Sequence, residues 1–75
     1  MIDLTTTTII NGAGDARQVA EALLALGQTY CDARTIAHYR IRGARCWGWD
    51  DERVLRAIRT ELQRALRDRA LSMFE

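Results

Sequence analysis

The spacing of apolar residues predicts an amphipathic helix over residues 16–26. Val19 and Leu23 lie four positions apart with apolar neighbours on the same face, while polar side chains point to the opposite face. Asp15 precedes the segment as a favourable N-cap residue, and Gly27 follows it as a residue that readily ends a helix. The segment therefore has a start signal, an apolar face and a stop signal.

A second and longer amphipathic helix is predicted over residues 51–72. Asp50 and Asp51 supply its cap, and Glu52 adds negative charge at the positive end of the helix dipole. Its apolar residues form one stripe at helical spacing: Leu55, Ile58, Leu62, Leu66 and Met73, flanked by Val54 and Ala65. This is the clearest element in the sequence.

The first ten residues follow a different pattern, which is typical of a β-strand. Thr5 to Thr8 is a β-branched run, and alternate residues fall on one face: Ile2, Leu4, Thr6, Thr8 and Ile10. Residues 11–14, Asn-Gly-Ala-Gly, have the composition of a turn, because glycine adopts positive φ without steric cost. We expect a strand over residues 1–10 that leads through this turn into the first helix.

Residues 28–49 fit two alternatives. As strands, apolar and polar residues alternate from Ala37 to Ile41, and Gly43-Ala44 supplies a type II′ turn before a return strand over 45–49. As a helix, Asp32 caps a segment with four apolar residues on one side: Ala33, Ile36, Ala37 and Ile41. The aromatic and β-branched content favours the hairpin.

These elements predict a single compact α+β domain over residues 1–75, in the order β-α-β-β-α. A short antiparallel sheet would pack on two helices. A chain of this length buries only roughly 60% of its unfolded surface, so it builds one modest core. If residues 32–42 are helical instead, the fold is a mostly-α winged helix-turn-helix.

The middle of the chain carries a local excess of positive charge. Residues 33–49 hold four arginines and no acidic residue, whereas the other residues hold seven arginines and ten acidic residues. Arginine interleaved with aromatic residues suits nucleic-acid phosphates and bases, and it equally suits a protein hot spot. We expect the partner-binding residues to be Arg34, His38, Arg40, Arg42, Arg45, Trp47 and Trp49.

A second row of arginines lies on the last helix, opposite its apolar stripe: Arg53, Arg56, Arg64 and Arg67. Acidic residues stand three or four positions from two of them, which allows the pairs Glu52–Arg56, Glu61–Arg64 and Arg64–Asp68. Such spacing is typical of a salt-bridged, solvent-exposed helix face. A secondary partner-binding face is the alternative.

Candidate catalytic and metal-binding residues are few. The chain has one histidine, His38, and two cysteines, Cys31 and Cys46, and no local motif orients them as a nucleophile and its base. With Asp50 they match no common zinc-ligand spacing. We therefore expect no enzyme, no metal and no cofactor. No apolar run is long enough to span a membrane and the N-terminus lacks signal-peptide features, so a cytoplasmic location is expected.

Ten residues resemble a known family. Arg34-Thr-Ile-Ala-His-Tyr-Arg40, followed by Ile41-Arg-Gly43, resembles the second helix and wing entry of MerR-type winged helix-turn-helix regulators and of phage excisionases. The resemblance implies a DNA-binding transcriptional regulator or excisionase. In that case the residues that face DNA would be Arg34, His38, Tyr39 and Arg40, with Arg42 and Arg45 on the wing.

The hypothesis that the sequence favours is a small non-enzymatic regulator that blocks or modulates a protein or nucleoprotein complex, as phage-encoded inhibitors and anti-CRISPR proteins do. Its anchors would be Arg40, Arg42, Arg45, Trp47 and Trp49. The alternative is a winged-helix DNA binder, although the sequence pI of about 7.8 is below that of most dedicated DNA-binding domains. A homodimer through the C-terminal helix is a further expectation. An exposed helix over 32–42 would favour DNA, whereas a packed hairpin over 35–49 would favour a protein partner.

Overall fold

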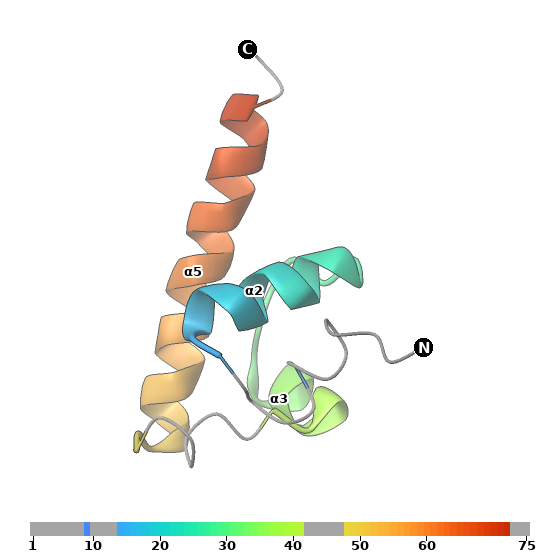
Figure 1. The fold of residues 1–75 in the computed structure, drawn as a ribbon. Coiled ribbons are helices and arrows are strands. Elements are labelled where there is room, and N and C mark those ends of the chain that lie inside the picture. Colours follow the sequence, from blue (N-terminus) through green and yellow to red (C-terminus); the bar gives the residue numbers. More distant parts are fainter. Residues whose placement is uncertain (1–8, 10–13, 42–47, 73–75) are drawn as a thin grey trace.

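The described residues of the computed structural model, which are residue 9, residues 14–41 and residues 48–72, form three helices and no β-strand (Figure 1). Helix α2 spans Ala16–Ala25, α3 spans Ala33–Tyr39, and α5 spans Asp51–Ser72. Helix α2 crosses the long helix α5, and α3 lies near the first turns of α5 (Figure 1).

Both ends of α2 are closed by the signals that its sequence contains. The Asp15 side chain accepts a hydrogen bond from the Gln18 N–H at 2.9 Å, and the Gln18 side chain accepts one from the Asp15 N–H at 3.0 Å, which is a capping box. At the other end Gly27 adopts φ +82°, and the N–H of Gln28 donates to the Leu23 carbonyl at 2.9 Å. This is a Schellman motif, and the prediction of a helix ending before Gly27 is confirmed.

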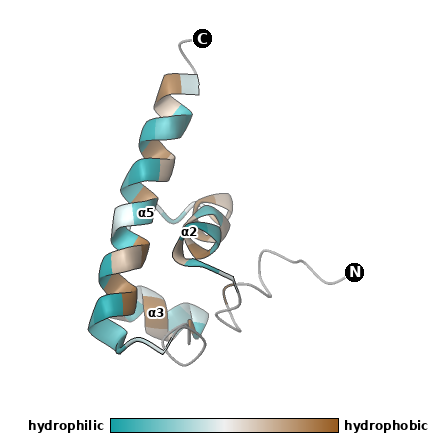
Figure 2. Ribbon diagram, turned by 60° about the vertical axis from the view of Figure 1, so that its left-hand side comes forward, coloured by the Kyte–Doolittle hydropathy of each residue, from teal (hydrophilic) through white to brown (hydrophobic). Residues whose placement is uncertain are grey.

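Helix α5 also matches its prediction. The Asp50 carboxylate accepts a hydrogen bond from the Arg53 N–H at 2.8 Å, and the helix runs 22 residues to Ser72. Its stripe is buried at Val54, Ile58, Leu62 and Ala65, and half-buried at Leu55 and Leu66. Hydrophobic and hydrophilic residues alternate along the α5 ribbon in Figure 2, as an amphipathic helix requires. Met73, the last predicted member of the stripe, lies outside the described residues.

The core lies mainly between α2 and α5. Val19, Leu23 and Ile58 have no exposed surface, and Leu62 is 2% exposed. Three buried residues from outside these two helices complete the core: Ile9, Cys31 and Ile41. Burying such a side chain stabilises the fold by roughly 1.5–3 kcal/mol, so this contact holds α2 against α5.

The predicted α+β fold with a hairpin is wrong for the described residues, because residues 33–39 form a helix. The Asp32 side chain accepts the N–H of Thr35 at 2.9 Å and so caps α3. At the other end Arg40 adopts φ 54° and ψ 43°, and the N–H of Ile41 donates to the Ile36 carbonyl at 3.0 Å. Capping at both ends and burial of Ile41 therefore prevail over the β-propensity of the segment.

The helical alternative for this segment is correct, but its buried face differs from the prediction. Ala33 and Ala37 are exposed, whereas Thr35 is buried and Tyr39 is half-buried. The turn expected at Gly43-Ala44 and most of the return strand lie outside the described residues. So does the strand expected over 1–10, apart from Ile9, which is buried and has helical backbone.

Candidate functional site

The outer face of α3 is exposed and basic. Its exposed residues are Ala33, Arg34, Ala37 and His38, with Arg40 directly after the helix. The helix contains no acidic residue, and neither Arg34 nor Arg40 forms an ion pair with a carboxylate in the described part of the chain. Two guanidinium groups are therefore available to an outside partner.

A groove runs along the N-terminal side of α3. Its volume is about 330 Å³ and it is lined by Gln28, Tyr30, Asp32, Arg34, Thr35, His38 and Tyr39; we call it the α3 groove. The rings of His38 and Tyr39 meet edge to face, with centroids 4.7 Å apart. Tyr30 is 64% exposed, so its ring is open to a partner.

A hydrogen-bond network holds the turn that precedes α3. The Gln28 side-chain amide donates to the Tyr30 carbonyl at 3.1 Å and to the Thr35 hydroxyl at 3.4 Å. The Thr35 hydroxyl in turn donates to the Asp32 carboxylate at 3.1 Å. Hydrogen bonding from the Thr35 backbone, against a smaller opposing effect of desolvation, lowers the pKa of Asp32, so this carboxylate stays ionised. The network fixes the start of α3 relative to Tyr30.

The same turn is held from the other side by α5. The Arg59 Nε donates to the Cys31 carbonyl at 2.6 Å. A second groove of about 320 Å³ lies here, which we call the turn groove; it is lined by Thr29, Tyr30, Cys31, Asp32, Arg59, Leu62 and Gln63. Tyr30 and Asp32 line both grooves, so the two grooves adjoin at the turn.

Cys31 is among the residues that line the turn groove, but it is only 3% exposed. Burial raises the pKa of its thiol to about 11, although the nearby positive charge of Arg59 acts in the opposite direction. A thiol in that state is protonated at neutral pH and is a poor nucleophile. Cys46, the other cysteine, lies outside the described residues.

Trp49 lies on a different part of the surface. It is half-buried and packs against the core, and the Arg53 guanidinium stacks on its ring at 4.3 Å from the centroid. The hollow beside it is lined by Ala16, Trp49, Arg53, Arg56, Ala57, Thr60 and Glu61 and shares no residue with the α3 groove. Trp49 therefore belongs with α5 and not with the outer face of α3.

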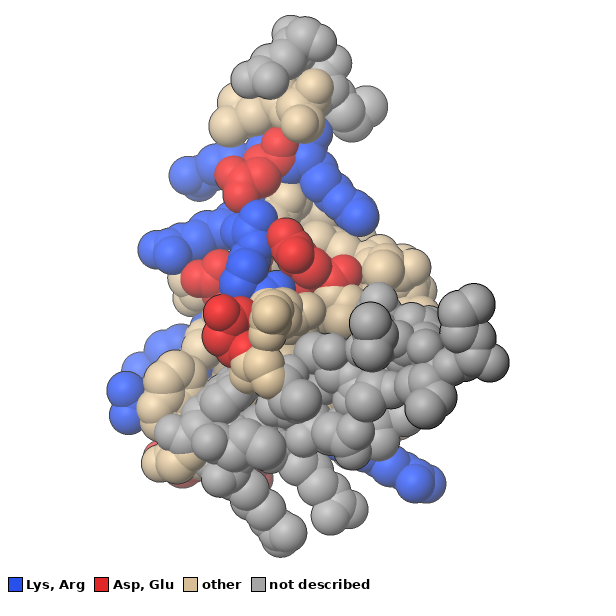
Figure 3. Space-filling model, viewed as in Figure 1, with Lys and Arg blue, Asp and Glu red and all other residues tan. Residues whose placement is uncertain are grey.

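The arginine row of α5 is partly neutralised, as its spacing predicts. Arg56 lies 3.6 Å from Glu52, and Arg64 lies 3.2 Å from Glu61. Figure 3 shows arginines along the outer edge of α5. The pair expected between Arg64 and Asp68 does not form, because Asp68 binds a residue of α2 instead.

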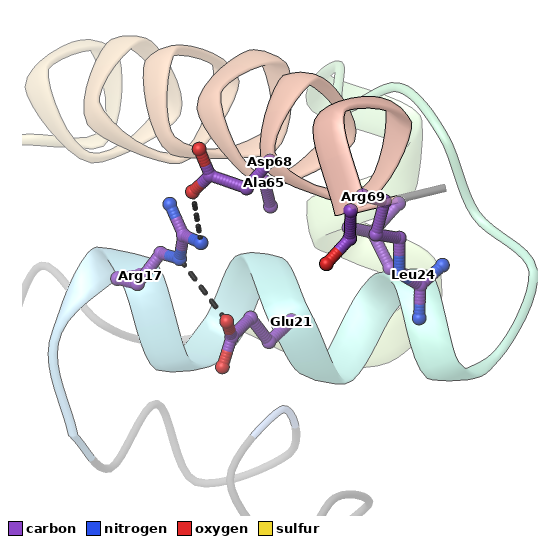
Figure 4. Close-up of a pocket in the computed structure, with 7 residues that line it drawn as sticks. Arg17, Glu21, Leu24, Ala65, Asp68 and Arg69 are labelled. Atoms are coloured by element: carbon purple, nitrogen blue, oxygen red, sulfur yellow. Dashed lines mark hydrogen bonds and ion pairs between the residues drawn. The ribbon is translucent and has the colours of Figure 1, made fainter. Parts of the chain in front are cut away.

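That residue is Arg17, which joins three carboxylates where α2 crosses α5. Its guanidinium lies 2.8 Å from Asp68, 3.2 Å from Glu21 and 3.7 Å from Glu61. Figure 4 shows it between α2 and α5, with Asp68 on one side and Glu21 on the other. We call these four residues the Arg17 cluster; its single guanidinium offsets only part of the charge of its three carboxylates.

The predicted partner-binding residues are thus divided. Arg34, His38 and Arg40 lie together on α3 or directly after it, whereas Trp49 lies on another surface. Three other predicted residues lie outside the described part of the chain: Arg42, Arg45 and Trp47. Sequence reasoning missed Tyr30 and Arg59, although an aromatic residue in a polar segment between two helices was a usable signal.

Two further observations restrict the site. In residue 9, residues 14–41 and residues 48–72, no three histidine, cysteine or acidic side chains gather where they could hold a metal ion. None of the helices in the described part is long and apolar enough to cross a membrane. Comparison with protein-family models, curated proteins and solved structures finds no significant match.

Proposed function

We propose that the protein is a non-enzymatic, cytoplasmic regulator that binds double-stranded DNA through α3. The observation that carries the proposal is the exposed outer face of this helix, where Arg34 and His38 lie on a helix without acidic residues, with Asp32 at its N-cap. A hairpin packed on both helices would have favoured a protein partner. The resemblance of residues 34–43 to winged helix-turn-helix regulators supports the same function.

The dimensions of α3 suit the major groove of DNA. An α-helix with its side chains is about 10–12 Å in diameter, and the major groove is about 12 Å wide. Arg34 would bind guanine or a phosphate in two-pronged geometry, and the Ala37 methyl group would allow close approach to the bases. Arg40, which follows the helix, would bind the backbone.

The expected affinity is modest. The chain has a formal net charge of only +1, and α3 with Arg40 offers two arginines. Few phosphate contacts give affinities on the order of 1–100 μM and a shallow dependence on salt. Pairing of two copies through the last turns of α5, where Leu71 is 59% exposed, would double these contacts, and molar-mass measurement in solution tests that expectation.

Fluorescence anisotropy with a labelled duplex tests the proposal. The wild-type protein should bind at about 50 mM salt and lose affinity as salt rises, because bound arginines release counterions. Arg34→Ala should weaken binding about tenfold. Arg67→Ala is the matched control, since Arg67 is also exposed and lies opposite the buried stripe of α5. The proposal fails if the wild-type protein does not bind at low salt, or if both variants weaken binding equally.

A protein partner is the second candidate, and one specific observation favours it. Tyr30 is 64% exposed and shares its two grooves with Arg34 on one side and Arg59 on the other. Tyrosine and arginine are, with tryptophan, the residues enriched at protein hot spots. In this case Tyr30→Ala should abolish recovery of the partner in a pull-down, while Arg67→Ala should not. Of the anchors expected for a protein partner, Arg40 is exposed and Trp49 is half-buried.

A further inference from the structure

The turn groove presents two hydrogen-bond donors beside α3. The Tyr30 side chain points to solvent although the chain around it is held, since its carbonyl accepts the Gln28 amide and the next residue, Cys31, is buried. Rotation of the backbone cannot readily withdraw the ring. The phenol is therefore attached to a fixed point of the backbone, and its hydroxyl can donate to a ligand.

Arg59 is held at the other side of the same groove. Its Nε donates to the Cys31 carbonyl at 2.6 Å, and its side chain forms no ion pair with a carboxylate among residues 14–41 and 48–72. A guanidinium has five N–H donors, so four remain for a ligand. Because one bond already orients the planar group, less side-chain freedom is lost when a ligand binds.

Donors of this kind select an anion with several acceptor oxygens. Guanidinium and phenol donors both bind phosphate, and the side chains of Thr29 and Gln63 line the same groove. Asp32 lines it as well, and its ionised carboxylate repels a free anion. The same repulsion acts on a phosphodiester, so the groove binds a backbone phosphate only where other contacts hold the strand, and it binds inorganic phosphate in solution poorly.

We infer that Tyr30 and Arg59 bind a backbone phosphate of the duplex whose major groove receives α3. The inference rests on the proposed function and adds a second contact, made by the turn and α5. Its geometric basis is that Tyr30 and Asp32 line both grooves, so the two grooves adjoin at the turn and a DNA strand held in the α3 groove would lie beside the turn groove. A phosphate contact does not distinguish one base from another; it sets the position of α3 on the DNA.

Salt-dependent binding of three variants tests the inference. Arg59→Gln should lower affinity about fivefold to tenfold on every duplex and reduce the slope of log affinity against log salt by about 0.9, the value for one phosphate. Tyr30→Phe removes only the hydroxyl and should lower affinity about twofold to fivefold with the slope unchanged. Arg67→Gln, the control with the same change in charge, should alter neither. Inorganic phosphate at the same ionic strength should compete no better than chloride.

The outcomes separate this inference from the proposed function. If the wild-type protein does not bind DNA at low salt, both fail. If it binds and Arg34→Ala weakens it, but Arg59→Gln and Tyr30→Phe leave affinity and slope unchanged, the second contact alone is overturned. Circular dichroism checks that Arg59→Gln is folded. If it is not, Tyr30→Phe decides, because an exposed hydroxyl can be removed without disturbing the core.

Discussion

The Arg59 Nε donates to the Cys31 carbonyl at 2.6 Å and thereby connects the turn before α3 to α5. These two residues are 28 positions apart in the sequence. Cys31 lies outside the helices, so this bond gives its carbonyl a hydrogen-bond partner that no helix supplies. The Cys31 side chain remains free to enter the core. The turn is consequently part of the packed structure, and α3 is presented from a fixed base.

Arg40→Gly should stabilise the protein, because Arg40 adopts φ 54° at the end of α3. A left-handed conformation costs a non-glycine residue about 1–2 kcal/mol, which glycine avoids. Glycine also has more conformational freedom in the unfolded chain, and this offsets part of the gain. We expect a net gain of about 0.5–1 kcal/mol in the free energy of unfolding, measured by urea denaturation. Arg40→Ala removes the same charge without relieving the strain. Equal stability of the two variants would refute the explanation.

Thr35→Val should destabilise the protein by about 1–2 kcal/mol, because the hydroxyl is buried and both accepts and donates a hydrogen bond. Valine has a similar shape, so the core around it is preserved. Thr35→Ser retains the hydroxyl and should recover the network at a smaller cost. Denaturant unfolding of the three proteins provides the comparison, and a valine variant as stable as wild type would show that the network adds nothing.

Acid should remove the contribution of Asp32 to stability. Its folded pKa is lowered, chiefly by the Thr35 backbone N–H, so the stabilisation is present above the unfolded pKa of about 3.9 and is lost as pH falls through the lower folded value. Asp32→Asn keeps an acceptor for the cap but cannot ionise. The difference in melting temperature between wild type and Asp32→Asn should therefore shrink below about pH 4. A difference that stays constant down to pH 2 would contradict this.

Cys31 should resist alkylation in the folded protein. Burial raises the pKa of its thiol to about 11, so at pH 8 its thiolate fraction is about a hundredfold below that of an ordinary cysteine. The measurement is iodoacetamide labelling followed by mass spectrometry, in a Cys46→Ser background so that only Cys31 reacts. Unfolding in guanidinium should restore ordinary labelling, and equally fast labelling without denaturant would disprove the burial of this side chain.

Helices α2 and α5 could be predicted because several local signals agree in each. Asp15 and Asp50 form the expected caps, Gly27 ends α2, and the apolar stripe of α5 is buried where the spacing placed it. Helix α3 could not be assigned from local preference, since its residues also suit a strand. Its C-terminal end depends on Arg40 in a left-handed conformation that arginine rarely adopts. No sequence pattern predicts that conformation.

The candidate site was predictable in part for a related reason. Arg34 and His38 could be chosen because a basic segment without acids is visible in the sequence. Tyr30 and Arg59 could not be associated with each other, since their common groove exists only when the turn packs on α5. A site assembled from segments far apart in the chain becomes visible only with the fold.

The Arg17 cluster has an electrostatic consequence for the candidate site. It holds Glu21, Glu61 and Asp68 where α2 crosses α5, whereas the two grooves beside α3 are lined by Arg34, Arg59 and one carboxylate, Asp32. Because the three carboxylates are kept at the crossing, their repulsion of an approaching polyanion acts away from the grooves beside α3.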